Sequence, residues 1–242
     1  MLELKDIVWD ADDGERIIDG VSFKVPDHKL VVITGPNGGG KTTIAKLIAG
    51  IVEPTSGEMY FNGDEITRDS ITDRARKGIS YSFQQPVRFK GITVREMMNL
   101  AAGRELSDHA LCNLLGRVGL CMADYIDREI SAKLSGGEIK RIEIASVLAR
   151  RSSMMVFDEP EAGIDLWSFT QLVQVFETLK KEEHASLLII SHQERIIDIA
   201  DEIIVVKDGK VAGQGTKEEI LPTLMLQGYN DSCSVKKMRN VI

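Results

Sequence analysis

One glycine-rich stretch of the sequence has the residue types and spacing that bind phosphate groups. It comprises Gly35, Pro36, Asn37, Gly38, Gly39, Gly40, Lys41 and Thr42, followed by Thr43. The stretch fits the pattern G-x-x-x-x-G-K-[ST], with an apolar run before it and a helix-compatible run after it. Backbone N–H groups in such a loop form an anion-binding nest, and the following helix points the positive end of its dipole at the same place.

This loop predicts a nucleoside triphosphate site. We expect Lys41 to reach the β- and γ-phosphates and the Thr42 hydroxyl to bind Mg²⁺. The alternative is a glycine-rich turn that binds nothing. A strand before the loop and a helix after it favour the phosphate site, because both elements are part of the motif.

Two acidic residues and a histidine follow other apolar runs. Asp158 and Glu159 come after residues 154–157, and His192 ends a similar segment. Ligands of open parallel sheets bind beyond the carboxyl ends of the strands, so we expect these side chains to converge on the phosphate loop. Asp158 is predicted to hold Mg²⁺ through its water shell, and Glu159 to orient the water that attacks phosphate. The alternative is an acidic pair in an ordinary turn before Pro160.

Ser135, Gly136 and Gly137 form a second candidate anion site, because a hydroxyl and free amides here precede a helix. The alternative is a helix N-cap in which Ser135 caps the helix and Glu138 closes a capping box. Both interpretations can hold, but an N-cap does not need two consecutive glycines, which lose backbone entropy on folding. Two anion sites for one nucleotide predict an active site that is shared between two copies of the chain.

The elements that must position these residues predict an α/β fold. Short apolar runs alternate with helical patterns, which indicates a mainly parallel core sheet. The expected core strands are 30–34, 78–83, 154–157 and 187–190. The segments 2–8 and 17–25 alternate as half-buried strands do, and 58–61 leads into a tight turn at Asn62-Gly63. These segments predict an antiparallel β subdomain at the N-terminal end.

Helical periodicity over 93–102 and 107–118 predicts a helical subdomain inserted at about residues 85–135. Long helices are expected over the segments 139–150 and 166–181, with a terminal helix at 217–226 and a polar tail at 228–242. The predicted organisation is a single domain over residues 1–242.

Composition limits the class of protein. The chain has 242 residues, of which 43% are hydrophobic and 28% charged, as in an ordinary globular protein. Its net charge of −7 argues against broad affinity for nucleic acid or for an anionic membrane. Three cysteines without a C-x-x-C pair favour a reducing compartment. No signal peptide and no apolar run of 18 residues is visible, so we expect a cytoplasmic protein that reaches a membrane only through a partner.

The order of these motifs resembles that of the ATP-binding cassette (ABC) ATPases over nearly the whole chain. The matching positions are residues 35–42, Gln84, residues 134–138, Asp158, Glu159, Asp165, Ser191 and His192. The Leu-Ser-Gly-Gly-Glu segment at 134–138, here called the signature segment, is the most specific of them. The resemblance implies a phosphate-loop fold that binds ATP and Mg²⁺ and acts as a head-to-tail dimer with two ATP molecules sandwiched between the chains.

The resemblance also implies roles for individual residues. Gln84 is similar to the glutamine that senses Mg²⁺ and the attacking water and couples the site to a partner. Ser135 and Gly137 would contact the γ-phosphate bound to the opposite chain. Asp165 resembles the aspartate of the D-loop, and His192 resembles the switch histidine that contacts the γ-phosphate.

Two positions depart from the family pattern. Position 39 is Gly where the family commonly has Ser, which removes a side chain but keeps the cradle of amides. The family usually stacks adenine on an aromatic residue before the phosphate loop, and Trp9 is the candidate here. The alternative is that Trp9 is only a packing residue at a strand end.

The residues that follow three of these motifs help to distinguish between kinds of cassette ATPase. They are residues 138–144, residues 85–87 and residues 192–198. All three resemble SufC-like ATPases, which power iron–sulfur cluster assembly with a SufB/SufD-type scaffold. The alternative is the ATP-binding subunit of a membrane transporter with separate permease chains. A translation or DNA-repair ATPase is disfavoured, because the chain has one phosphate loop and no sustained heptads.

Overall fold

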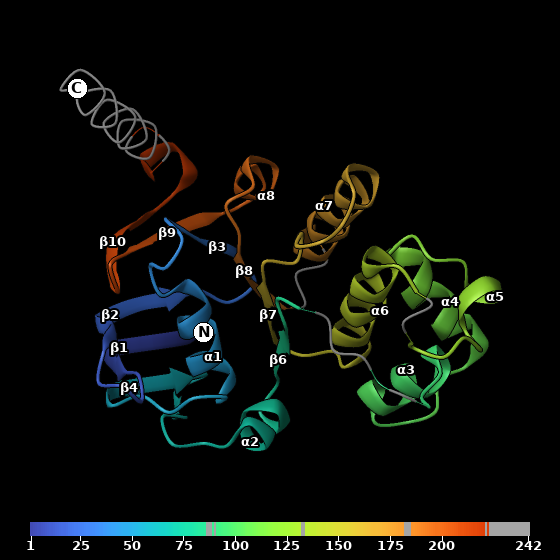
Figure 1. The fold of residues 1–242 in the computed structure, drawn as a ribbon, viewed down its shortest axis with the longest axis horizontal. Coiled ribbons are helices and arrows are strands. Elements are labelled where there is room, and N and C mark those ends of the chain that lie inside the picture. The colour runs from blue at the N-terminus through green and yellow to red at the C-terminus, as the bar shows by residue number, and fades with distance from the viewer. Residues whose placement is uncertain (86–88, 90, 132–133, 182–184, 221, 223–242) are drawn as a thin grey trace.

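A six-stranded sheet forms the centre of the structure, a computed structural model that describes residues 1–85, 89, 91–131, 134–181, 185–220 and 222. Its strand order is β10-β9-β3-β8-β7-β6 (Figure 1). The strands are β3 (Leu30–Thr34), β6 (Ile79–Ser82), β7 (Met154–Asp158), β8 (Ser186–Ile190), β9 (Glu202–Lys207) and β10 (Lys210–Gly215). Neighbouring strands are parallel except in the β9–β10 hairpin. The predicted mainly parallel sheet is confirmed.

A second, antiparallel sheet lies at the N-terminal end, as the alternating segments predict. It contains β1 (Leu2–Asp10), β2 (Arg16–Val25), β4 (Ser56–Phe61) and β5 (Asp64–Glu65) in the order β2-β1-β4-β5. Asn62 and Gly63 connect β4 to β5 with φ angles of 53° and 90°, as the Asn-Gly pair of a tight hairpin turn requires. This sheet covers one face of the central sheet through a shared apolar core.

The helices lie around these sheets. They are α1 (Lys41–Ala49), α2 (Ile71–Arg76), α3 (Val94–Ala102), α4 (Asp108–Arg117), α5 (Met122–Tyr125), α6 (Gly136–Ala149), α7 (Leu166–Lys181) and α8 (Glu194–Asp198). The helices α3, α4 and α5 gather beside α6 on the side of the molecule away from the N-terminal sheet (Figure 1). These three helices lie within residues 85–135, where the sequence predicts an inserted helical subdomain, and this group is called the helical subdomain below.

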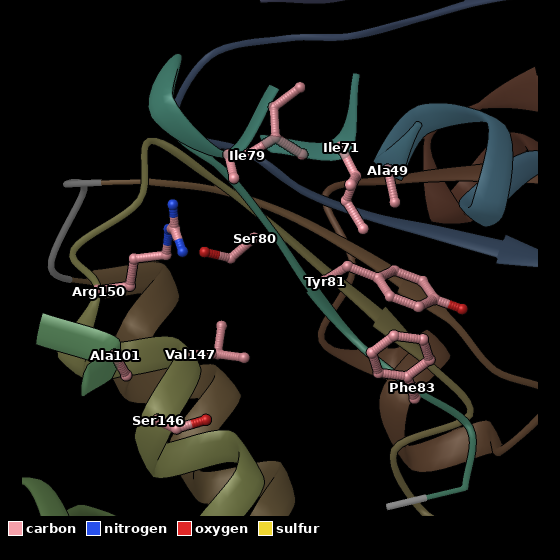
Figure 2. Close-up of a pocket in the computed structure, with 11 residues that line it drawn as sticks. Ala49, Ile71, Ile79, Ser80, Tyr81, Phe83, Ala101, Ser146, Val147 and Arg150 are labelled. Carbon is pink, nitrogen blue, oxygen red and sulfur yellow. The ribbon is translucent and has the colours of Figure 1, made fainter. Parts of the chain in front are cut away.

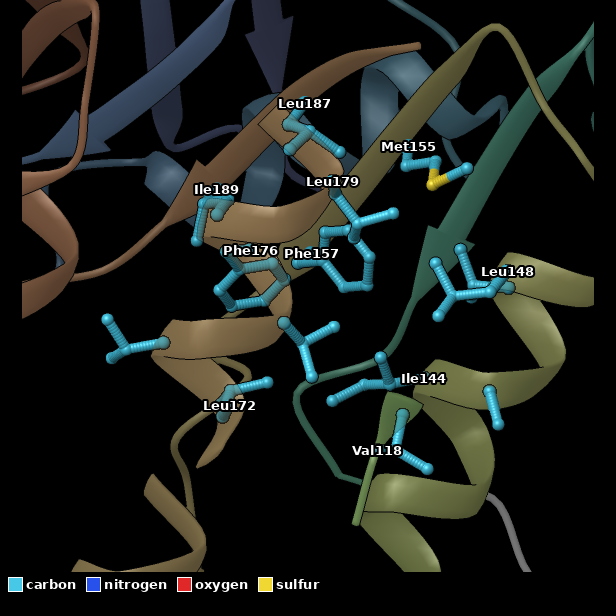
Figure 3. Close-up of a cluster of buried hydrophobic side chains, with 14 of the residues drawn as sticks. Val118, Ile144, Leu148, Met155, Phe157, Leu172, Phe176, Leu179, Leu187 and Ile189 are labelled. Atoms are coloured by element: carbon cyan, nitrogen blue, oxygen red, sulfur yellow. The ribbon is translucent and has the colours of Figure 1, made fainter. Parts of the chain in front are cut away.

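The central strands are buried on both faces, because successive side chains of a strand point in opposite directions. In β3, Val31 and Ile33 pack in the core shared with the N-terminal sheet and α1. Leu30 and Val32 belong to the opposite core, which also contains side chains of α6 and α7. In that second core Phe157 of β7 meets Phe176 of α7 with ring centroids 5.0 Å apart (Figure 3). The sheet is thus fixed from both sides.

The boundaries differ from the sequence expectation in a few places. Helix α6 begins at Gly136, three residues before the predicted start, because a complete capping box at Ser135 begins it. The short helices α2, α5 and α8 were not predicted, since six residues or fewer show no helical periodicity. Most of the expected terminal helix and the whole tail at 228–242 lie outside the described residues. In the described part of the chain, no helix has the length and apolarity needed to cross a membrane.

A buried arginine holds the end of the phosphate-loop helix. The Arg74 guanidinium donates to the carbonyls of Leu47 and Ile48 at the end of α1, and to those of Thr67 and Asp69. A cation at a helix C-terminus also interacts favourably with the helix dipole. Burial lowers the pKa of Arg74 to about 10, so the group remains charged near neutral pH.

Arg74→Met is expected to lower the free energy of unfolding by about 3 kcal/mol, because it leaves several buried carbonyl groups without donors. Urea denaturation measures this change. Arg76→Met is the matched control, since Arg76 lies on the same helix with an exposed side chain and should change stability by less than about 0.5 kcal/mol. Equal effects of the two substitutions would contradict the assigned role of Arg74.

Candidate active site

The strand order brings the predicted site residues to one edge of the central sheet. β3, β8, β7 and β6 are consecutive parallel neighbours. The phosphate loop follows β3, His192 follows β8, Asp158 ends β7 and Gln84 follows β6. The carboxyl ends of neighbouring parallel strands share an edge, so four separate segments of the sequence meet there.

The phosphate loop needs glycine where the backbone is left-handed or crowded. Gly35 has φ 138°, and a Cβ atom there would lie 2.0 Å from the Val206 carbonyl oxygen. Gly40 has φ 99° and forms the N-cap of α1, so the N-terminus of this helix opens directly onto the loop. Gly39 has no left-handed φ, but a Cβ atom there would lie 3.0 Å from the Val206 carbonyl oxygen and 3.1 Å from that of Pro36, so a side chain at this position requires a small shift of its neighbours. The loop therefore presents amides and a helix N-terminus to an anion.

The Lys41 ammonium lies across the phosphate loop. Its Nζ donates to the carbonyl oxygens of Gly35 and Pro36 at 2.9 and 2.8 Å, and the residue is only 5% exposed. Burial lowers the pKa of Lys41, while the negative charges of Glu159 and Asp158 act in the opposite direction. A cation held in this place is available to phosphate oxygens at the loop.

Thr42 and Asp158 form an oxygen-rich pair at the start of α1. The Thr42 hydroxyl donates to Asp158 Oδ1 at 3.1 Å, and the Asp158 side chain is completely buried. Burial raises the pKa of Asp158, and the hydrogen bonds from Tyr81 and Thr42 oppose this rise. Mg²⁺ prefers oxygen ligands and takes few of them from protein when phosphates are present, so this pair fits the ion.

Glu159 and Gln84 are in direct contact. The Gln84 amide donates to Glu159 Oε2 at 2.6 Å, so a residue after β6 meets one after β7. Glu159 has a φ of 43°, which is uncommon for a residue other than glycine and typical of constrained positions at functional sites. Its backbone N–H donates to the Ile190 carbonyl of β8 at 3.0 Å. The carboxylate is thus fixed by the sheet edge, where it can accept a hydrogen bond from a water molecule.

His192 lies exposed at the end of β8, next to a polar pair of buried Ser191 and partly buried Glu161. The hydroxyl of its neighbour Ser191 donates to Glu161 Oε1 at 2.6 Å, and burial raises the pKa of Glu161. The Ser191 N–H donates to the Ile33 carbonyl of β3, which ties this segment to the strand before the phosphate loop. The imidazole itself is therefore available to a ligand.

The signature segment forms the capping box that the sequence allowed as an alternative. Ser135 Oγ accepts from the Glu138 N–H, and Glu138 accepts from the Ser135 N–H. Ser135 and Gly136 remain exposed. Helix α6 lies well apart from α1 in Figure 1, and among the described residues no hydrogen bond joins the signature segment to the phosphate loop. The two anion sites of one chain are not brought together.

Asp165 is engaged within its own chain. Its carboxylate accepts hydrogen bonds from the N–H groups of Trp167 and Ser168 and from the Ser168 hydroxyl. Asp165 thereby caps the start of α7. These bonds lower the pKa of Asp165. A Cβ atom at Gly137 would lie 3.8 Å from Asp165 Oδ2, so the loop before α7 lies beside the signature segment. Leu166 and Trp167 next to it are 71% and 83% exposed.

Trp9 lies on β1 opposite Ile18, where the register of β1 and β2 is irregular. It is partly buried against the core of the N-terminal sheet. This position is compatible with both sequence interpretations, packing at a strand end and stacking on a base.

Sequence reasoning missed three residues that support the site. Lys140 and Glu143 form a buried ion pair on α6 with an N–O distance of 3.3 Å. Glu143 accepts from the Phe83 N–H at 2.7 Å, and the Lys140 ammonium donates to the Phe83 carbonyl, so α6 holds the segment just before Gln84. Both residues belong to the segment 138–144 that continues the signature segment. Its SufC-like sequence was the signal that could have pointed to them. Tyr81, whose hydroxyl donates to Asp158 Oδ2 at 3.0 Å, gave no signal in the sequence.

Comparison with known proteins shows which family the chain belongs to. The family model described as ABC transporter matches residues 18–162. An uncharacterised ABC transporter ATP-binding protein of Methanocaldococcus jannaschii is 37% identical over 86% of this chain and 86% of its own length. The energy-coupling factor transporter ATP-binding protein EcfA of Methanoculleus marisnigri is 30% identical over 98% of this chain and 88% of its own length.

The fold has solved counterparts as well. The dimeric post-hydrolysis state of an ATP-binding cassette bound to ADP and phosphate superposes with a TM-score of 0.80, covering 90% of this chain and 99% of that one at 23% identity. The matched family model covers the phosphate loop, the signature segment and the carboxylates at the end of β7. The chain belongs to the ABC transporter family, and it is an ATP-binding cassette that hydrolyses ATP.

Proposed function

We propose that this chain is the ATP-binding subunit of a membrane transporter whose membrane-spanning segments belong to other chains. The names of the relatives in Methanocaldococcus jannaschii and Methanoculleus marisnigri support this function. They favour it over the SufC-like function that the motif continuations suggest. The sequence analysis kept this function as its alternative.

The observation that carries the proposal is a groove of about 230 Å³ (Figure 2). It lies between the part of the molecule that contains the phosphate-loop helix α1 and the part that contains α3 and α6. Helices α1 and α2 and strand β6 form one wall, and α3 and α6 form the other. Ile71, Tyr81 and Phe83 line it on the first side, and Ala101 and Arg150 on the second. The groove leads to Phe83, the residue before Gln84, so a segment docked there lies next to the Gln84–Glu159 contact.

Co-purification from membranes of the native host tests the proposal. A tagged chain is expected to bring down a polytopic membrane protein. Ile71→Arg should abolish this capture, because it places a charge in the groove at a half-exposed position. Leu100→Arg is the matched control, since Leu100 is an exposed apolar residue of α3 outside the lining of the groove. A complex that contains no membrane protein would refute the transporter function.

Iron–sulfur cluster assembly is the second candidate. It rests on the SufC-like continuation of the signature segment, in which Lys140 and Glu143 bind the backbone of Phe83. The same experiment distinguishes the two functions, because a SufB/SufD-like scaffold would replace the permease among the captured proteins.

The same catalytic roles are proposed under either function. Lys41 and the loop amides would bind the phosphates, and Thr42 and Asp158 would hold Mg²⁺, which would neutralise phosphate charge there. Glu159 orients the attacking water, with Gln84 fixing the carboxylate, and His192 contacts the γ-phosphate. A second copy of the chain supplies Ser135, Gly136 and Gly137, with Asp165 beside them.

The exposed tryptophan next to Asp165 reports on the proposed dimer. In a Trp9→Phe, Glu159→Gln background, in which bound ATP is not hydrolysed, Trp167 is the single tryptophan, because the chain has two. ATP with Mg²⁺ is expected to shift its emission to shorter wavelength and to lower acrylamide quenching several-fold, since burial excludes water and quencher. ADP is the control and should leave both signals unchanged. A dimer by size-exclusion chromatography with a fully quenchable Trp167 would place this residue outside the interface.

A further inference from the structure

The carboxylate of Asp158 is held from two sides by hydroxyl groups. Thr42 donates to Oδ1 at 3.1 Å, and Tyr81 donates to Oδ2 at 3.0 Å. Tyr81 lies on β6, in register with Val156 of the neighbouring strand β7, so its hydroxyl reaches forward to the end of that strand. With both oxygens bonded and the side chain completely buried, the carboxylate has one orientation in this structure.

The Tyr81 hydroxyl is a reliable donor. Its oxygen lies 3.0 Å from Asp158 Oδ2, a normal hydrogen-bond distance, and burial raises the pKa of the phenol. The hydroxyl therefore occupies Oδ2, which leaves Oδ1 facing the Thr42 hydroxyl.

The ring of the same tyrosine belongs to the groove. Tyr81 and Phe83 both line it, and their rings pack edge to face with centroids 4.9 Å apart (Figure 2). One rigid side chain thus touches the groove with its ring and Asp158 with its hydroxyl. A tyrosine has two side-chain torsions, so displacement of its ring also displaces its hydroxyl.

We propose that Tyr81 is the positioning residue that sets the Asp158 carboxylate for Mg²⁺ and connects it to the groove. This proposal rests on the proposed magnesium role of Asp158 and on the proposed docking function of the groove. It adds a route between them that does not pass through Gln84. Contacts in the groove would change metal binding through the tilt of one ring.

The first test measures Mg²⁺ affinity of the intact chain with a non-hydrolysable ATP analogue bound. Mn²⁺ binding followed by electron paramagnetic resonance, with Mg²⁺ as competitor, reads the metal directly and needs no turnover. Tyr81→Phe keeps the ring and removes the hydroxyl. It is expected to weaken metal affinity roughly tenfold or more, because a hydrogen bond to a charged group is lost.

Controls separate positioning from general damage. Tyr60→Phe removes another hydroxyl that donates to a carboxylate, that of Glu58 on the exposed face of β4, and should leave metal affinity unchanged. Affinity for the analogue without metal should stay unchanged in Tyr81→Phe, since the phosphate loop is intact. Unchanged metal affinity in Tyr81→Phe would overturn the proposal, as would an equal loss of metal-free nucleotide binding.

A double-mutant cycle tests the connection to the groove. Phe83→Ala removes the ring that supports Tyr81, and it is expected to weaken Mg²⁺ affinity several-fold when Tyr81 is present and to have no effect in Tyr81→Phe. Equal effects in both backgrounds, or none in either, would refute the connection. These measurements use the isolated chain, so they do not depend on which partner co-purifies. Failure to capture a membrane protein would refute the transporter function and leave the metal data intact.

Discussion

Glu159→Gln is expected to bind ATP with nearly wild-type affinity and to hydrolyse it roughly 10²- to 10⁴-fold more slowly, the range that a positioned general base supplies. The amide of glutamine cannot accept a proton from the attacking water. The variant should keep its fold, because the amide oxygen can still accept the hydrogen bond from Gln84. Steady-state phosphate release and equilibrium ATP binding measure the two effects separately.

ATP that is bound but not hydrolysed should also trap the dimer. Size-exclusion chromatography of Glu159→Gln in ATP is therefore expected to show a dimer that the wild type populates only transiently. Glu161→Gln is the matched control, because Glu161 lies two residues further in the same loop and its carboxylate is bonded to Ser191. Hydrolysis by Glu159→Gln at the wild-type rate would show that another group orients the water.

The parts of the site that could be predicted from the sequence depend on local rules. The phosphate loop is contiguous, and its glycines serve backbone conformations that one stretch of sequence already specifies. Asp158 and His192 were predicted to lie at the sheet edge because apolar runs mark the strands and strand ends carry ligands. The antiparallel N-terminal sheet followed from alternation, and the Asn62-Gly63 turn from its residue types.

The supporting contacts could not be predicted, because they join residues far apart in the sequence. Tyr81 and Asp158 are 77 positions apart, and Phe83 and Glu143 are 60 apart. Such pairs are fixed by strand order and helix packing, for which a single sequence has no local signal. Arg74 is a further example, since a charged residue on a short segment gives no sign that it is buried against the end of α1.

The contacts that the sequence does not predict at the site lie close together. Tyr81 belongs to β6, and Lys140 and Glu143 bind β6 or the residue just after it. All of them lie between the phosphate-loop helix α1 and the helical subdomain. The strand β6 is an edge strand of the central sheet, paired only with β7 among the described strands. The C-terminal end of β6 forms hydrogen bonds with α6 and with Asp158. Displacement of α6 is therefore expected to move both Gln84 and the Asp158 carboxylate.

Ser135→Arg is expected to abolish ATP hydrolysis while leaving ATP binding intact. Helix α6, which Ser135 caps, lies apart from the phosphate-loop helix α1 of the same chain (Figure 1), so a large cation at position 135 should not disturb nucleotide binding within that chain. In the proposed head-to-tail dimer the same residue would face the nucleotide of the other chain, where an arginine side chain would prevent closure. Hydrolysis should fall by at least about 10²-fold, and the dimer should fail to form in ATP.

The matched control for this variant is Ser107→Arg. Ser107 is the exposed N-cap of α4 and accepts from the Ala110 N–H, just as Ser135 accepts from the Glu138 N–H at the start of α6. Each substitution removes one N-cap, which destabilises the protein by about 1 kcal/mol. Only Ser135 belongs to the signature segment, so only its variant should lose hydrolysis. If Ser135→Arg hydrolyses ATP at the rate of Ser107→Arg, each active site is complete within one chain.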